Sequence, residues 1–232
     1  MKRASTILFD LDGTLADGGR GILDSLAYAL RVAGVPVPPE ATLRSFVGPP
    51  FSVTFGQRLG LDPETAARAV AAYREHYVTE GAMLEATPFP GVPELLRSLE
   101  DAGRRLAVAT SKPEQLARRL LQHLGIESYF VDVVGAGEGG EGAVKAAVIS
   151  EAARRLRIDG DRATMVGDRE DDVIGARAQG IACIGVLWGY GTRDELQAAG
   201  ADALVSSAEE LGQVLLDGSV GGDGQGKGGC LA

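Results

Sequence analysis

The chain has 232 residues, of which 45% are hydrophobic and 24% are charged, and its formal net charge is −9. This composition is typical of a folded globular protein and argues against an intrinsically disordered one. The negative charge argues against a general nucleic-acid or anionic-membrane binder, because both need a basic surface. Any phosphate site must therefore take its positive charge from a few lysines, from backbone N–H groups or from a bound cation.

The first predicted strand carries the most informative segment. Residues 7–9 form an apolar run, and Asp10 and Asp12 follow it before the chain turns at Gly13. Side chains two residues apart in a strand share a face, so the two carboxylates are expected to converge where this strand ends. In an open α/β sheet, ligands bind beyond the carboxyl ends of the strands. The segment therefore predicts an active site.

Residues 20–83 are predicted to be almost wholly helical. Apolar residues recur at helical spacing over 22–30, and Gly34 ends that segment. Asp62 and Pro63 are typical of an N-cap followed by a first helical position, and they open a helix that runs toward Glu80. Nothing in this part of the sequence indicates a strand.

From residue 91 onward, predicted helices alternate with short β-rich runs, which indicates right-handed crossovers and a mainly parallel sheet. The helices are expected at 93–102, 113–124, 143–157, 171–179 and from 207, and the strands at 105–110, 131–134, 163–166, 181–186 and 203–205. The predicted fold class is α/β, a doubly wound, Rossmann-like sheet with an inserted helical cap. The core is expected at 1–15 and 88–217, the cap at 16–87, and a disordered glycine-rich tail at 218–232.

A second strand-end segment contains Thr110, Ser111 and Lys112. Hydroxyl groups there can donate hydrogen bonds to an anion, together with the backbone N–H groups that open the next helix. Ser111 has an alternative role as the N-cap of that helix, because Glu114 stands where a capping box requires it.

A third strand-end segment, 167–172, is acidic. A hard divalent ion such as Mg²⁺ takes oxygen ligands and would relieve the repulsion among these side chains. Asp168 is the expected direct ligand, and Asp172, one turn further, is expected to reach the site through water. Glu170 and Asp171 fit better as solvated acids at a helix start.

Lys145 lies at the start of a predicted helix, where a cation is unfavourable for the helix itself. Its position suggests that it serves a negatively charged group. Lys112 competes for the same role as phosphate clamp. A nucleophile, a proton donor, a metal site and cationic clamps are what phosphoryl transfer requires.

Four motifs in order give the chain its resemblance to a known family. Residues 10–15, Thr110 with 111–112, Lys145 and 167–172 resemble the four motifs of the haloacid dehalogenase-like hydrolases, and the chain looks like their phosphoglycolate phosphatase branch. The resemblance implies a Mg²⁺-dependent phosphomonoester hydrolase that acts on a small phosphorylated metabolite through an aspartyl-phosphate.

The resemblance also implies the role of each matching residue. Asp10 would attack phosphorus, and Asp12 would act as general acid and base. Mg²⁺ would be held by Asp10, by the main-chain carbonyl of Asp12 and by Asp168. Thr110 would hydrogen-bond the transferring group, and Lys145 would offset its charge.

Other readings remain open at this point. A sugar-phosphate mutase would use the same aspartates, and a non-catalytic binding module would keep the fold; dehalogenation is disfavoured because Asp12 is present. Phosphoglycolate is the first expectation for the substrate. Arg20, Arg44 and the turn at 48–50 follow no spacing rule that would make them ligands. A monomer or homodimer is expected.

A cytoplasmic location without membrane attachment is expected. Cys183 and Cys230 have no metal or redox spacing, which suits a reducing compartment. The first residues lead into the apolar run at 7–9 without a signal-like segment, and no apolar stretch reaches the roughly 18 residues of a spanning helix.

Overall fold

A six-stranded parallel sheet forms the centre of the protein. The structure is a computed structural model that describes residues 5–48, 52–137, 144–158 and 162–217. The strand order is β5-β4-β1-β6-β7-β8, and every neighbouring pair is parallel. The strands are β1 (Thr6–Phe9), β4 (Arg105–Pro113), β5 (Phe130–Ala136), β6 (Ala163–Gly167), β7 (Ala182–Val186) and β8 (Ala203–Val205). The predicted fold class is confirmed.

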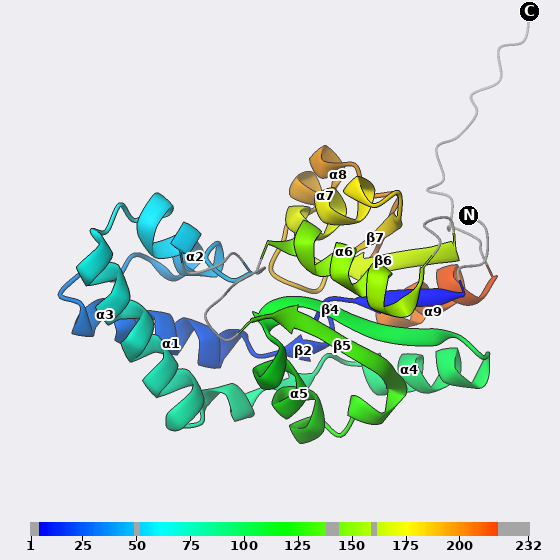
Figure 1. Cartoon of the computed structure of the whole chain (residues 1–232), viewed down its shortest axis with the longest axis horizontal. Coiled ribbons are helices and arrows are strands. Elements are labelled where there is room, and N and C mark those ends of the chain that lie inside the picture. The colour runs from blue at the N-terminus through cyan, green and yellow to red at the C-terminus, as the bar shows by residue number, and fades with distance from the viewer. Residues whose placement is uncertain (1–4, 49–51, 138–143, 159–161, 218–232) are drawn as a thin grey trace, which may run out of the picture.

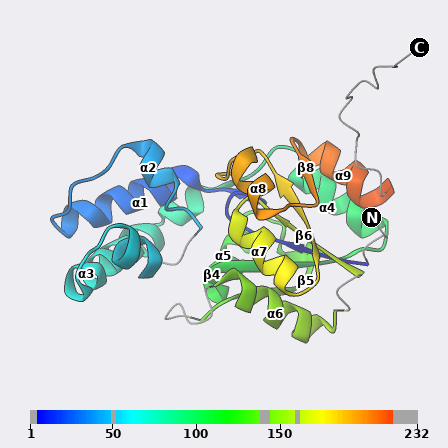
Figure 2. The ribbon, with the colours of Figure 1, turned by 90° about the horizontal axis from the view of Figure 1, so that it is seen from above.

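Helices cover both faces of this sheet (Figures 1 and 2). They are α4 (Val92–Asp101), α5 (Glu114–His123), α6 (Lys145–Leu156), α7 (Glu170–Ala178), α8 (Arg193–Ala199) and α9 (Ala208–Asp217). The apolar run of β1 is continuous because its side chains enter two cores. Ile7 and Phe9 pack in the cluster that contains α4, α5 and α9, and Leu8 packs in the cluster that contains α6 and α7.

A helical segment, residues 19–85, follows the first strand and lies to one side of the sheet (Figure 1). It contains α1 (Gly19–Val32), α2 (Glu40–Arg44), the π-helix η1 (Ser52–Arg58), α3 (Pro63–Arg74), the π-helix η2 (Glu75–Thr79) and the 3-10 helix η3 (Ala82–Glu85). The Asp62 carboxylate accepts hydrogen bonds from the N–H groups of Glu64 and Thr65, so the predicted N-cap is confirmed.

Both ends of the helical segment pass through a short antiparallel ribbon that was not predicted. It consists of β2 (Ala16–Asp17) and β3 (Thr87–Pro88), with Ala16 opposite Pro88. Two-residue strands carry no alternation of apolar and polar residues, so sequence periodicity has nothing to detect. The ribbon brings the entry and the exit of the helical segment together beside Asp12, which makes an isolated bridge with Ala16.

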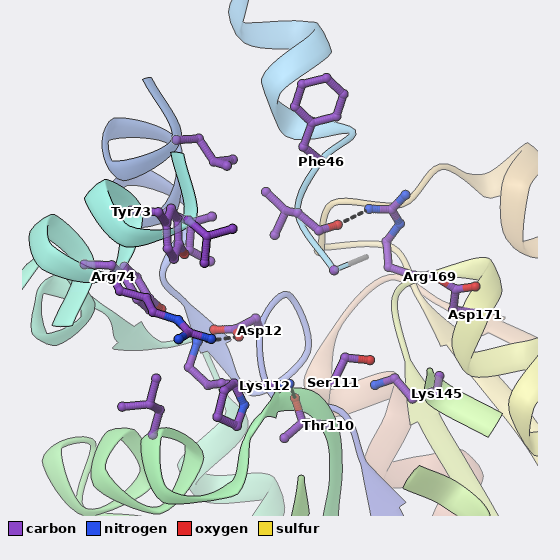
Figure 3. Close-up of a pocket in the computed structure, with 18 of the residues that line it drawn as sticks. Asp12, Phe46, Tyr73, Arg74, Thr110, Ser111, Lys112, Lys145, Arg169 and Asp171 are labelled. Carbon is purple, nitrogen blue, oxygen red and sulfur yellow. Dashed lines mark hydrogen bonds and ion pairs between the residues drawn. The ribbon is translucent and has the colours of Figure 1, made fainter. Parts of the chain in front are cut away.

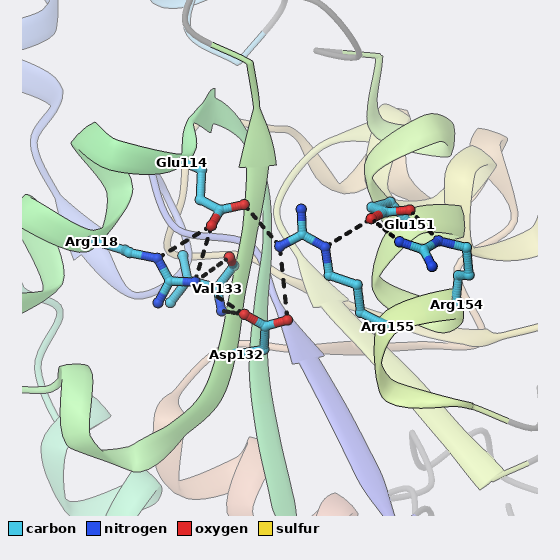
Figure 4. Close-up of polar contacts among 7 residues, drawn as sticks. All are labelled: Glu114, Arg118, Asp132, Val133, Glu151, Arg154 and Arg155. Carbon is cyan, nitrogen blue, oxygen red and sulfur yellow. Dashed lines mark hydrogen bonds and ion pairs between the residues drawn. The ribbon is translucent and has the colours of Figure 1, made fainter.

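A charged network fastens two helices across the edge strand β5 (Figure 4). Arg118 of α5 contacts Glu114 and Asp132, and Arg155 of α6 reaches the same two carboxylates from the other side. Partly exposed pairs such as these each contribute at most about 1 kcal/mol. Because both arginines contact Asp132, they connect α5 and α6 to strand β5.

The capping role considered for Ser111 is wrong. Strand β4 continues to Pro113, and α5 begins at Glu114 without a side-chain cap. The predicted glycine-rich tail and part of the loop before Lys145 lie outside the described residues. Among the helices that the structure describes, none combines the length and the hydrophobicity needed to cross a membrane.

Candidate active site

Three buried aspartates meet at the carboxyl ends of β1 and β6. Phe9 and Val166 are register partners in these neighbouring strands, so Asp10 and Asp168 leave the sheet side by side. Asp172 joins them from the first turn of α7. One carboxylate oxygen of each lies within 4.8 Å of the others. The structure thus places Asp172, which the sequence expected to reach the metal site through water, in the same cluster as Asp10 and Asp168.

Lys145 is the cation at this cluster. Its Nζ donates a hydrogen bond of 2.5 Å to Oδ1 of Asp10 and one of 3.1 Å to the Ala109 carbonyl, and it lies 2.8 Å from Asp172 Oδ1. Its side chain is only 6% exposed. Of the two lysines that competed for the position beside Asp10, Lys145 occupies it.

Lys112 pairs instead with Asp12. Its Nζ lies 2.7 Å from Asp12 Oδ2 and donates a 2.8 Å hydrogen bond to the Tyr77 hydroxyl. The ammonium also lies 4.8 Å from the centre of the Tyr77 ring, within the range of a cation–π contact. Because Tyr77 belongs to η2, this lysine links the second strand-end carboxylate to the helical segment. The sequence gave no sign of this contact.

The Asp168 carboxylate is held by groups from two loops. Oδ2 accepts a 2.7 Å hydrogen bond from the Tyr190 N–H, and Oδ1 accepts one of 3.3 Å from the Thr14 hydroxyl. Gly13 and Gly189 pack so closely on it that a Cβ at either position would collide with the Asp168 side chain. Gly13 also has φ +92°, which side chains disfavour. Neither position therefore has room for a side chain while Asp168 stays in place.

The charges of the cluster do not balance. Burial, with Asp10 and Asp172 nearby, raises the pKa of Asp168 to about 8, and burial raises that of Asp172 to about 6. Burial opposes the charge of Lys145, but Asp10 and Asp172 outweigh it, and its pKa is raised. Three carboxyl groups thus share one ammonium, and without a further cation they cannot all be ionised at neutral pH. This all-oxygen set fits a hard divalent cation, which would supply the missing positive charge.

A cavity of about 440 Å³ opens on these residues (Figure 3). The sheet side contributes its polar wall, which includes Asp10, Asp12, Thr110, Ser111 and Lys145. Thr110 is buried and Ser111 half-buried, so both predicted hydroxyls lie at the cavity. The Thr110 hydroxyl accepts a hydrogen bond from the Lys112 N–H and keeps its own proton available for an anion.

The opposite wall of the cavity comes mainly from the helical segment. Its side chains are largely apolar: Ile22, Leu26, Phe46, Val47, Pro63, Ala66, Ala67, Val70, Tyr73, Tyr77 and Val78, with Arg74 among them. Arg20 and Arg44 are absent from the lining. Both are exposed and form i,i+4 ion pairs with Asp24 and Glu40. Of the turn at 48–50, Gly48 lines the cavity and the two prolines lie outside the described residues.

Arg169 is a further residue that the sequence did not single out. Its guanidinium donates to Glu195 of α8 at 2.8 Å and also to the Val47 carbonyl of the helical segment. It therefore joins the loop after β6 to the opposite wall of the cavity. In the sequence, Arg169 stands between Asp168 and Glu170, inside an acidic segment. That position gives no indication of its contacts with Glu195 and Val47.

Comparison with known proteins agrees with this geometry. The family model described as haloacid dehalogenase-like hydrolase matches residues 7–186. The chain is 42% identical over 211 residues to the tyrosine-protein kinase PtkA of Mycobacterium tuberculosis, covering 90% of this chain and 72% of that protein. It is 38% identical over 213 residues to a 5'-nucleotidase of Pseudomonas aeruginosa, covering 92% and 96%.

Two further similar proteins carry the name phosphatase. A phosphoglycolate phosphatase of Vibrio vulnificus is 31% identical over 218 residues, covering 90% of this chain and 95% of that protein. A solved structure titled as a predicted phosphatase from Clostridium acetobutylicum superposes with a TM-score of 0.88 at 40% identity, covering 92% and 99%. The expected family and enzyme class are confirmed. The chain belongs to the haloacid dehalogenase-like hydrolases and is a phosphatase of that family.

Proposed function

We propose that the protein is a Mg²⁺-dependent phosphomonoester hydrolase that acts on a small phosphorylated metabolite through an aspartyl-phosphate on Asp10. The observation that carries this proposal is the position of Asp10. Its carboxylate faces the cavity, one oxygen is neutralised by Lys145 at 2.5 Å, and two more buried carboxylates adjoin it. An ionised carboxylate so oriented is a competent nucleophile.

The reaction divides between the two strand-end aspartates. An oxygen of Asp10 bonds to phosphorus while the bond to the leaving oxygen breaks, and Asp12 gives that oxygen its proton. Asp12 then takes a proton from water, which attacks phosphorus, releases phosphate and regenerates the Asp10 carboxylate. Lys112, 2.7 Å from Asp12, orients its carboxylate.

Two other side chains hold the transferring group. Lys145 offsets the negative charge that Asp10 and the phosphate bring together, and the Thr110 hydroxyl donates to a phosphoryl oxygen. Mg²⁺ would be held by Asp10, Asp168 and the main-chain carbonyl of Asp12, and it would neutralise charge on the phosphoryl oxygens. Asp172 positions Lys145, which it contacts at 2.8 Å.

The helical segment acts as a cap in this proposal. Its described residues line the cavity on the side opposite the aspartates, and they meet the sheet side through Lys112 with Tyr77 and through Arg169 with Val47. A cap that lines the site excludes water and contacts the leaving group.

Hydrolysis of p-nitrophenyl phosphate tests the proposal. Activity with Mg²⁺ should disappear with EDTA and in Asp10→Asn, and the exposed Asp24→Asn should retain it as the matched control. Borohydride added during turnover should reduce the acyl phosphate and leave homoserine at position 10, detected by mass spectrometry. Full activity in Asp10→Asn would refute the role of this residue.

The 42% identity to a tyrosine-protein kinase motivates a second candidate, transfer of the phosphoryl group to a phenol rather than to water. Incubation with γ-labelled ATP separates the two functions. Label on protein tyrosine supports the kinase, whereas release of phosphate from p-nitrophenyl phosphate with no label on tyrosine supports the hydrolase. Label moved between positions of a sugar phosphate would support a mutase, and inactivity across all these assays would support a binding module.

A further inference from the structure

The wall that faces the leaving group differs in chemistry from the wall that faces the phosphate. The aspartates, Lys145 and Thr110 occupy the sheet side, whereas the helical segment contributes mostly apolar side chains (Figure 3). Three of them are aromatic: Phe46, Tyr73 and Tyr77. Because the reacting phosphate is fixed at Asp10, the group that enters the apolar half is the remainder of the substrate.

The aromatic side chains of this wall are ordered by their neighbours. The rings of Tyr73 and Tyr77 lie 5.1 Å apart at an interplanar angle of 30°. Lys112 holds the Tyr77 hydroxyl at 2.8 Å, next to Asp12. Val70 lies two turns, about 10 Å, before Tyr77 along α3 and η2. The apolar wall therefore begins near Asp12, the proposed general acid and base. It is longer than a two-carbon leaving group.

Three cationic side chains at the cavity already contact other groups of the protein. Lys145 contacts Asp10, Lys112 contacts Asp12, and Arg169 contacts Glu195 and Val47. Within the described part of the helical segment, Arg74 alone adds a cationic side chain to the lining. A carboxylate on the leaving group would have to compete for these cations inside a mostly apolar pocket, which is unfavourable.

We propose that the cavity selects phosphomonoesters whose leaving group carries an aromatic ring, and that Val70, Tyr73 and Phe46 determine this specificity. The inference rests on the proposed hydrolase function and adds the substrate class. Aromatic rings pack well against other rings and aliphatic side chains, and they fill a volume that a short acid leaves to water. Phosphoglycolate, the first expectation from the sequence, is in this view a poor substrate.

The test compares benzyl phosphate with phosphoglycolate. Both lose a primary alkoxide, so they differ mainly in the group that enters the apolar half. The value of kcat/KM should be at least about tenfold higher for benzyl phosphate, since a single methylene in a hydrophobic pocket already gives about 10- to 200-fold discrimination. Val70→Phe should fill the pocket and lower the ratio of the two values about tenfold.

The matched control is Val32→Phe, which makes the same substitution at an exposed residue of α1 that does not line the cavity. It should leave both values unchanged. Preference for phosphoglycolate in the native protein, lost in Arg74→Gln, would overturn the inference and would show that the pocket reads an acid. The hydrolase function would then still stand.

Binding supplies a readout that does not need turnover. With Mg²⁺ present, 2-phenylethylphosphonate should bind at least about tenfold more tightly than 3-phosphonopropionate in calorimetry, and Val70→Phe should reduce that ratio. Tighter or equal binding of the acid would overturn the inference even if Val70→Phe failed to fold. No hydrolysis of either ester, together with selective binding of 2-phenylethylphosphonate, would refute the proposed hydrolysis and retain the aromatic pocket.

Discussion

Replacing Asp168 by asparagine should remove a pH-dependent destabilisation of the metal-free protein. Burial and the adjacent Asp10 and Asp172 raise the pKa of Asp168 from its ordinary 3.8 to about 8. Between these values the folded chain keeps a proton that the unfolded chain has released. The free energy of unfolding therefore falls as the pH rises from about 4 to about 8, and this residue adds no further change above pH 8.

The magnitude follows from the size of the shift. One pKa unit corresponds to 1.36 kcal/mol, so a rise of about four units corresponds to about 6 kcal/mol as an upper bound. Water entry and relaxation of the cluster reduce it, and we expect a loss of about 3 kcal/mol or more at pH 8. Asparagine carries no charge and can still accept from the Tyr190 N–H. In a chain of this length, the difference corresponds to roughly 6–12 °C in Tm.

Thermal unfolding in EDTA, followed by circular dichroism between pH 5 and 9, measures this effect. Between pH 6 and 8 the native protein should lose stability, whereas Asp168→Asn should stay nearly level. Below pH 6 both should share the contribution of Asp172, whose pKa is raised to about 6. Mg²⁺ at a hundredfold excess over its Kd should raise the free energy of unfolding of the native protein by about 2.7 kcal/mol. The same concentration should hardly change the free energy of unfolding of Asp168→Asn.

The exposed Asp24→Asn serves as the control and should follow the native curve. A native protein in EDTA that is equally stable at pH 6 and pH 8 would refute the reasoning. So would an Asp168→Asn variant with the same pH dependence as the native chain. Either result would mean that the cluster relieves its charge without a proton or a metal ion.

Three further substitutions test the cation contacts. Lys145→Met should lower the free energy of unfolding by about 3–5 kcal/mol, since it leaves buried carboxylates unpaired, and should lower kcat at least about 100-fold; urea unfolding and steady-state kinetics measure both. Lys112→Met should lower kcat about 10- to 100-fold with little change in KM for p-nitrophenyl phosphate, because Asp12 loses its orienting partner. Arg169→Met should cost about 1.5–3 kcal/mol in urea unfolding, because it removes a partly buried hydrogen bond to Glu195.

Each of these expectations has a result that contradicts it. Native stability in Lys145→Met would show that the aspartates do not depend on its charge. An unchanged kcat in Lys112→Met would remove that lysine from the acid and base step. For Arg169, the double variant with Glu195→Gln should cost little more than either single change, and additive losses would show that the two side chains act independently.

The sequence alone determined the sheet and the chemistry that its strand ends carry. The apolar run at 7–9, its termination at Asp10, and the alternation of helices and strands after residue 91 are all local patterns, so each could be read without coordinates. The parallel sheet that they predict brings the strand ends to one edge, and Asp168 and Thr110 lie at that edge as expected.

Only the tertiary structure decided which charged groups meet. Lys112 and Lys145 are equally plausible clamps in the sequence, and the fold pairs the first with Asp12 and the second with Asp10. Asp172 enters the cluster because it lies in the first turn of α7, which begins at Glu170, three residues after β6 ends. Such pairings join residues about a hundred or more positions apart, and no local pattern records the distance between them.

The character of the cavity also came from the tertiary structure. Tyr73 and Tyr77 read in the sequence as one side of an amphipathic helix, which is how they pack, but that helix also forms a wall opposite the aspartates. Periodicity tells which face of a helix is buried and not what lies across from it. Short sequence motifs thus identify the reacting side chains. The part of the substrate that they can accept depends on how the helical segment packs opposite the ends of the strands, which only the tertiary structure shows.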